Sequence, residues 1–126
     1  MTLCTAPTLM VVGDDASFRY LIQRYAKKSA CSVVFTHLTE DVLPVVLQEE
    51  PGIVMVELDS PDGRGKDVLR DLKAHPGTRE IPVIVCSWTD ETEWSLKAGA
   101  AIHMQKPILY DDFYAALMDL RGWQTH

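Results

Sequence analysis

The sequence predicts an α/β fold in which a five-stranded parallel sheet carries helices on both faces. Five short apolar runs alternate along the chain with five stretches of helical periodicity. Two of these runs, residues 53–58 and 81–87, are almost wholly apolar, which is typical of strands buried on both faces. The connections are too short for anything but crossovers, so we expect a right-handed winding.

The first strand and helix follow a short leader. Residues 1–7 are expected to be this leader, and the strand covers residues 9–12 before an acidic loop begins. Either Asp15 or Ser17 caps the next helix. The apolar positions that mark this helix at helical spacing are Phe18, Leu21, Ile22, Tyr25 and Ala26.

The second and third strands are predicted at residues 32–36 and 53–58, with a helix between them. Pro44 is tolerated only in the first turn of a helix, so this helix begins at about Val42 and runs to Glu50. Its inward positions are predicted to be Leu43, Val46 and Leu47.

The second half of the chain supplies the remaining elements. The predicted helices are residues 66–75, 92–98 and a closing helix around 113–120, and the strands are 81–87 and 101–104. Pro76 and Gly77 end the first of these helices and Gly99 ends the second. Asp111 and Asp112 lie at the positive end of the closing helix, where carboxylates are favourable.

Composition and charge restrict the class of protein. A chain of 126 residues can bury a core without disulfides, so we expect a single domain, residues 8–123, with no output domain. The net charge of -6 argues against a nucleic-acid partner. No apolar run reaches membrane-spanning length. Cys4, Cys31 and Cys86 lack metal-type spacing and indicate reduced thiols, so a cytoplasmic location is expected.

Polar residues follow four of the predicted strands. In a parallel sheet the carboxyl ends of such strands meet at one edge, where sites form. Carboxylates bind Mg²⁺ through oxygen, lysine neutralises phosphate, and a hydroxyl donates a further hydrogen bond. The pattern therefore favours a site for a phosphoryl group and a divalent cation. The residues are Asp14, Asp15, Glu57, Ser87 and Lys106.

In this order and spacing the chain resembles a response-regulator receiver (CheY-like) domain of two-component signalling, from about residue 8 to residue 122. Further matching features are Arg19, Pro61, Gly65, Gly99-Ala100 and Lys106-Pro107. The resemblance implies a flavodoxin-like fold with strand order 2-1-3-4-5. It also implies a domain that is not an enzyme and that accepts a phosphoryl group from a histidine kinase on an aspartate, with Mg²⁺. A hydroxyl on the fourth strand and an aromatic residue on the fifth sense that state.

The acidic part of the site departs from this pattern. The phosphoacceptor position is Glu57 instead of Asp, and the added methylene moves the carboxylate by about 1.5 Å, enough to disturb in-line attack. The expected acidic pair falls on Gly13 and Asp14, so one carboxylate is missing. Asp59 as acceptor would break the spacing to the following turn. A Mg²⁺ site from Asp14, Glu57 and the backbone at Asp59 is predicted to be weak.

The rest of the site departs as well. Trp88 stands beside Ser87, where the family has a small residue, and its indole is expected to cover the pocket. The segment from Ser87 to Gly99 is about three residues shorter than in the family. His103 takes the aromatic switch position, where an imidazole could titrate.

These features support a stand-alone receiver that is not phosphorylated in the ordinary way. An ion pair of Glu57 with Lys106 would hold the domain in one signalling state. The alternative that this ion pair is purely structural stays open. Function would come from contacts that the fourth helix, fifth strand and fifth helix make with a histidine kinase or a downstream effector. The same face could also form a homodimer. The alternative is a functional Mg²⁺-dependent phosphoacceptor. A flavin-binding enzyme is disfavoured, since the acidic loop would repel the cofactor phosphate.

Overall fold

The computed structural model describes residues 8–38 and 41–124. Within them, five strands form one parallel sheet in the order β2-β1-β3-β4-β5. The strands are β1 (Thr8–Val12), β2 (Ser32–Thr36), β3 (Ile53–Glu57), β4 (Val83–Ser87) and β5 (Ile102–Gln105). The helices are α1 (Ala16–Lys28), α2 (Val42–Glu49), α3 (Arg64–Ala74), α4 (Thr92–Lys97) and α5 (Tyr110–Gln124). The predicted fold class and strand order are confirmed.

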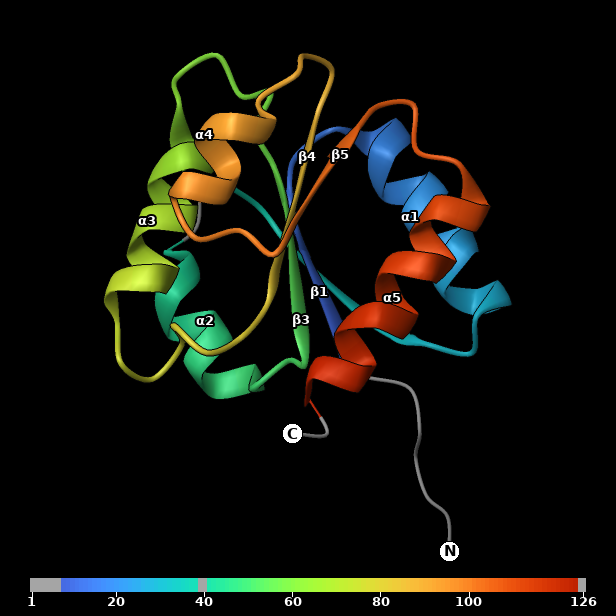
Figure 1. Cartoon of the computed structure of the whole chain (residues 1–126), viewed down its shortest axis with the longest axis horizontal. Helices are drawn as coiled ribbons and strands as arrows, with labels where there is room; N and C mark the ends of the chain where they lie inside the picture. The colour runs from blue at the N-terminus through green and yellow to red at the C-terminus, as the bar shows by residue number, and fades with distance from the viewer. Residues whose placement is uncertain (1–7, 39–40, 125–126) are drawn as a thin grey trace, which may run out of the picture.

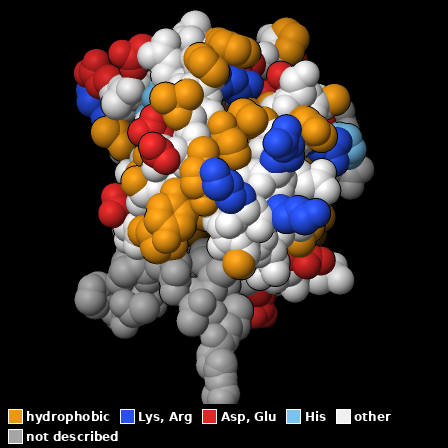
Figure 2. Space-filling view, turned by 90° about the vertical axis from the view of Figure 1, so that its right-hand side faces the viewer, with side chains coloured by type: hydrophobic (Ala, Val, Ile, Leu, Met, Phe, Trp, Pro, Cys, Tyr) orange, Lys and Arg blue, Asp and Glu red, His pale blue; other side chains and the backbone are white. Residues whose placement is uncertain are grey.

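The helices lie in two layers around the sheet. α1 and α5 cover one face, while α2, α3 and α4 cover the other (Figure 1). The outer surface on the α1 and α5 side mixes hydrophobic with basic side chains (Figure 2). Its exposed aromatic residues include Tyr20 and Tyr114.

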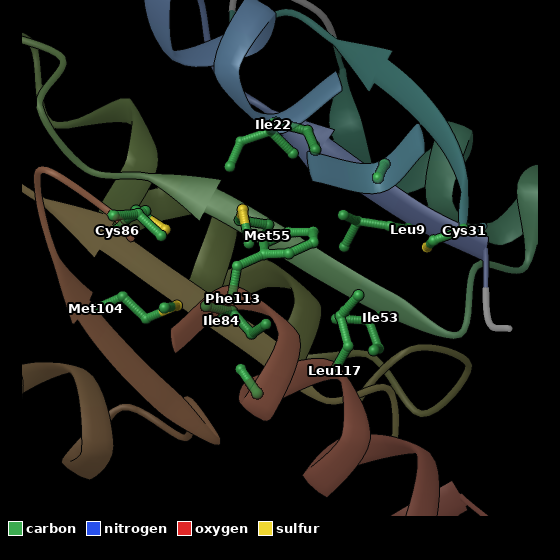
Figure 3. Close-up of a cluster of buried hydrophobic side chains, with 14 of the residues drawn as sticks. Leu9, Ile22, Cys31, Ile53, Met55, Ile84, Cys86, Met104, Phe113 and Leu117 are labelled. Atoms are coloured by element: carbon green, nitrogen blue, oxygen red, sulfur yellow. The ribbon is translucent and has the colours of Figure 1, made fainter. Parts of the chain in front are cut away.

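The core consists of two clusters separated by the sheet. Side chains alternate along each strand, so Ile53 and Met55 of β3 pack toward α1 and α5, whereas Val54 and Val56 pack against the other helices. Figure 3 shows the first cluster, in which Phe113 of α5 lies over the middle strands. Every residue of β3 and β4 is buried, which explains their continuous apolar sequences.

Several element boundaries differ from the prediction: for example, β3 ends at Glu57 and not at residue 58, and α5 spans Tyr110–Gln124 and not only about 113–120. β4 begins at Val83 and not at Ile81, because the Ile81 N–H donates to the Thr78 carbonyl in a turn and Pro82 has no N–H to offer the sheet. α3 begins at Arg64, two residues earlier than predicted.

One predicted core position is wrong. Leu47 of α2 is 38% exposed, and the buried positions of this helix are Val42 and Val46. A Cβ atom at Gly77 would lie 2.8 Å from Leu47 Cδ2. The Leu47 side chain therefore packs against the turn after α3 and not into the core between α2 and the sheet.

Cys31 and Cys86 are buried thiols, as expected for core cysteines. Burial raises the pKa of the Cys86 thiol, which keeps it protonated. The predicted leader, residues 1–7 with Cys4, lies outside the described residues. No helix in the described part of the chain has the length and apolar character to cross a membrane.

Candidate functional site

The site forms where the carboxyl ends of four strands meet. The loops after β1, β3, β4 and β5 lie together at the upper edge of the sheet in Figure 1. The strand register aligns these ends, since Glu57 pairs with Cys86 and Ser87 pairs with Gln105. The structure therefore brings Glu57, Ser87 and Lys106 together.

Glu57 and Lys106 form a buried ion pair through Glu57 Oε2. The exposed fractions of their side chains are only 5% and 4%. Lys106 Nζ also lies 2.8 Å from Asp59 Oδ2 and 4.6 Å from the centre of the Phe18 ring. Burial acts to lower the pKa of Lys106, but the two carboxylates outweigh burial and raise it above its ordinary value. The ammonium therefore stays charged inside the site.

Asp59 makes more contacts than the sequence suggested. Its Oδ1 accepts hydrogen bonds from Ser87 Oγ at 2.9 Å and from the Trp88 backbone N–H at 3.1 Å, and its Oδ2 faces Lys106. Burial acts to raise the pKa of Asp59, but hydrogen bonds from Lys106, Trp88 and Ser87 together lower it. Asp59 is thus held as a carboxylate by three donors.

Gly13 lies directly against Glu57. A Cβ atom on residue 13 would stand 2.5 Å from Glu57 Oε1 and 2.9 Å from Glu57 Cβ. No side chain fits there while the glutamate keeps this position. The Glu57 Oε1 atom accepts a long hydrogen bond, 3.4 Å, from the Asp15 backbone N–H. The longer side chain at residue 57 and the absent one at residue 13 therefore complement each other.

Gly65 also serves close packing. A Cβ atom there would lie 2.5 Å from the Glu57 carbonyl oxygen and 2.9 Å from Leu58 Cα. The glycine lets the first turn of α3 rest on the end of β3, which helps to position Glu57.

The carboxylates of the acidic loop after β1 have partners other than Lys106. Asp14 Oδ1 accepts from the Leu38 backbone N–H at 3.1 Å and contacts His37 Nδ1 at 2.9 Å, while Asp15 Oδ1 caps α1 through the Ser17 N–H. Sequence reasoning missed His37. Its contact could have been found from the parallel register, in which Val12 pairs with Thr36.

The described residues contain no group of three His, Cys, Asp or Glu side chains placed to hold a metal ion. The predicted weak Mg²⁺ set was Asp14, Glu57 and the backbone at Asp59, and the carboxylates in this part of the site already have other partners. Asp14 is bound to the loop after β2, and both other carboxylates are bound to Lys106. The ammonium supplies the positive charge that a cation would supply.

His103 lies outside this cluster but is connected to it. The Thr89 N–H donates to Ser87 Oγ at 3.2 Å, and Thr89 Oγ1 donates to Glu91 Oε2 at 3.1 Å. The Glu91 backbone N–H then donates to His103 Nε2 at 3.3 Å. Sequence reasoning missed Thr89 and Glu91, because only their positions in the shortened loop give them this role.

Trp88 borders the site without closing it. The residue is 57% exposed, and its ring centre lies 5.7 Å from Lys106 Nζ. An open cleft of about 330 Å³ is bordered by Asp14, Asp15, Glu57 and Asp59, and Trp88 is not part of its lining. The indole therefore lies near Lys106 without covering this cleft.

Comparison with known proteins gives consistent results. The family model for the response regulator receiver domain matches residues 9–118. Sensory/regulatory protein RpfC of Xanthomonas campestris is 30% identical over 118 residues, covering 89% of this chain but 16% of RpfC. Protein PilH of Pseudomonas aeruginosa is 26% identical over 103 residues, covering 79% of this chain and 85% of PilH.

Among solved structures, a response regulator described as putative, from Chloroflexus aurantiacus, has a similar fold. It superposes with a TM-score of 0.85 at 18% identity, covering 93% of this chain and 98% of that one. At this identity the likeness concerns the fold alone.

Proposed function

This chain belongs to the response regulator receiver domain family, and from that premise we propose that it acts in two-component signalling without ordinary phosphorylation of an aspartate. Receiver domains are generally signalling modules and not enzymes, and they interact with histidine kinases and effectors. The observation that carries the proposal is the Glu57 carboxylate, which is bound to Lys106 through one oxygen and to the Asp15 N–H through the other.

The chemistry of phosphoryl transfer supports this proposal. Receiver domains generally bind Mg²⁺ at the phosphorylation site, but here Lys106 neutralises the carboxylates that remain. Glu57 would have to break a buried ion pair before it could attack, and its carboxylate would then lack near-contact geometry. The acidic cleft beside it would also repel an anionic phosphoryl donor.

The proposed output is a fixed surface for protein partners. We place it on α4, β5 and α5, where it could serve a histidine kinase, a downstream effector or a second copy of the chain. The hydrogen-bond path from Ser87 to His103 supports this choice, because it connects the site to the start of α4 and to β5. A cytoplasmic location is part of the proposal, supported by the buried thiols of Cys31 and Cys86.

Phosphorylation by a small-molecule donor tests the proposal. The protein is incubated with acetyl phosphate and Mg²⁺, and its intact mass is measured. We expect the mass to stay unchanged. A stable adduct that requires Mg²⁺ would instead establish a functional phosphoacceptor, which is the alternative function for this chain.

A further inference from the structure

The strand β2 lies at one edge of the sheet, and within the described residues it pairs with β1 alone. Its five residues include three apolar ones and neither a charged residue nor a proline, which are the devices that commonly protect an edge strand. Val33, Val34 and Phe35 are only partly buried, whereas every residue of β3 and β4 is buried. The sequence of β2 therefore leaves an apolar edge without protection by charge.

The outer edge of β2 presents the backbone groups of two residues. The Thr36 carbonyl accepts from the Gly13 N–H at 3.0 Å, so residue 36 faces β1. Successive residues of a strand direct their backbone N–H and C=O groups to opposite edges. The backbone groups of Val33 and Phe35 therefore point away from β1, one residue before and one residue after Val34.

The opposite edge of the sheet carries charges that oppose pairing between identical chains. A groove of about 350 Å³ follows β5, and Asp112 and Asp119 of α5 line it. Two copies joined along β5 would bring these carboxylates together, and charges of this kind blunt an edge. Against β2 lies Arg19 instead, whose guanidinium is held over the Phe35 ring, 5.1 Å from its centre. Between the two edges, charge thus favours β2 for pairing of identical chains.

We propose that two copies of this chain pair antiparallel along β2, with the two-fold axis at Val34. In this register Val33 lies opposite Phe35 of the other copy, and Val34 lies opposite its own counterpart. The outward backbone groups then meet, and residues 33 and 35 exchange hydrogen bonds in both directions. The side-chain pairs are aromatic with β-branched or β-branched with β-branched, and such pairs stabilise adjacent strands.

This contact goes beyond the proposed function, because it uses the other edge of the sheet from the surface on α4, β5 and α5. A two-fold contact uses the same strand in both copies, so the assembly closes at a dimer. The paired strands are short, which places the interface among the small ones, and the association should be weak and dependent on concentration. It requires no change at residue 57.

Disulfide cross-linking tests the register. Cys4 is replaced by serine throughout, while Cys31 and Cys86 are buried. In the proposed dimer the two Cα atoms of residue 34 lie about 4.5 Å apart, within disulfide range, so Val34→Cys should form a covalent dimer under mild oxidation. Ser32→Cys is the matched control. Its position is more exposed, but its two copies would lie roughly 13 Å apart along the strands, so it should stay monomeric.

Sedimentation equilibrium tests the association without a cross-link. The average mass of the wild type should rise with concentration toward that of a dimer, with a dissociation constant below about 1 mM. Val33→Pro removes an outward N–H and keeps those that face β1, a position where an edge strand tolerates proline. This variant should sediment as a monomer, and circular dichroism checks that it is folded.

Three results would overturn the inference. They are a wild type that stays monomeric up to about 1 mM, a Ser32→Cys variant that cross-links as fast as Val34→Cys, and a folded Val33→Pro variant that still dimerises. The last result would assign the dimer to another face, such as α4, β5 and α5. If Val33→Pro does not fold, the two cysteine variants decide. A phosphoryl adduct on the wild type would contradict the proposed function and leave these measurements unaffected.

Discussion

The Glu57 side chain fills the space that a side chain on residue 13 would need: a Cβ atom at Gly13 would lie 2.5 Å from Glu57 Oε1. The buried glutamate fills the volume beside the glycine and turns its carboxylate to Lys106. The two departures from the receiver pattern are therefore a single structural feature. This relationship makes the stability of the site depend on both residues together.

The first prediction concerns this pair. Gly13→Asp alone should lower the free energy of unfolding by about 1–3 kcal/mol, because it overpacks a buried position. Glu57→Asp shortens the neighbouring side chain, so the double variant should recover most of that loss. Urea unfolding of both single variants and the double variant measures their coupling. Strictly additive losses would contradict the fit between the two residues.

The second prediction concerns Lys106. Lys106→Met leaves Glu57 buried without a counter-charge, and we expect a loss of about 3–5 kcal/mol in the free energy of unfolding. Lys97→Met is the matched control, because Lys97 pairs with Glu93 at the exposed surface and such pairs contribute little. Adding Glu57→Gln to Lys106→Met should restore part of the loss. Equal free energies of unfolding for the two lysine variants would mean that the buried ion pair does not stabilise the fold.

The third prediction concerns acid. The folded-state pKa of Asp59 lies below its ordinary value of 3.8, so its carboxylate stabilises the fold above that pH. This contribution is lost as the pH falls through the lowered folded-state pKa. Urea unfolding should therefore show a gap in stability between the wild type and Asp59→Asn at pH 7 that narrows below about pH 4. A gap of constant size across this range would contradict the ion pair with Lys106.

The fourth prediction concerns the tautomer of His103. Its Nε2 accepts from the Glu91 N–H. Thr92 Oγ1 donates to Asp90 Oδ1 at 2.6 Å, so the contact of 3.3 Å between Thr92 Oγ1 and His103 Nδ1 requires a proton on Nδ1. Nitrogen-15 NMR of the neutral imidazole should show the proton on Nδ1. A proton on Nε2 would break the proposed path from Ser87.

The fold was predictable because the hydrophobic pattern is strong. Residues 53–58 and 81–87 are apolar on both faces, and this alone requires a sheet covered on both sides. Burial was harder to predict near helix ends. Leu47 follows the helical spacing of core positions, yet its side chain packs against the turn at Gly77. Such a contact depends on tertiary structure and leaves no local signal.

The site was predictable only as a set of neighbours. The carboxyl ends of parallel strands meet at one edge of the sheet, and this rule predicted that Glu57, Ser87 and Lys106 lie close together. Which carboxylate would meet Ser87 depends on side-chain direction in the turn after β3, and the structure gives that contact to Asp59. Predicting the contact between Asp14 and His37 would have required the register of β1 against β2, which the two sequences alone do not give.

The central claim is that Glu57, in the space beside Gly13, prevents ordinary phosphorylation. Intact mass after incubation with acetyl phosphate and Mg²⁺ tests it most directly when the wild type is compared with Gly13→Asp/Glu57→Asp. We expect no adduct on the wild type and a Mg²⁺-dependent adduct on the double variant, which regains the acidic pair and the shorter acid. An adduct on the wild type, lost when Glu57 is replaced by Gln, would contradict the account.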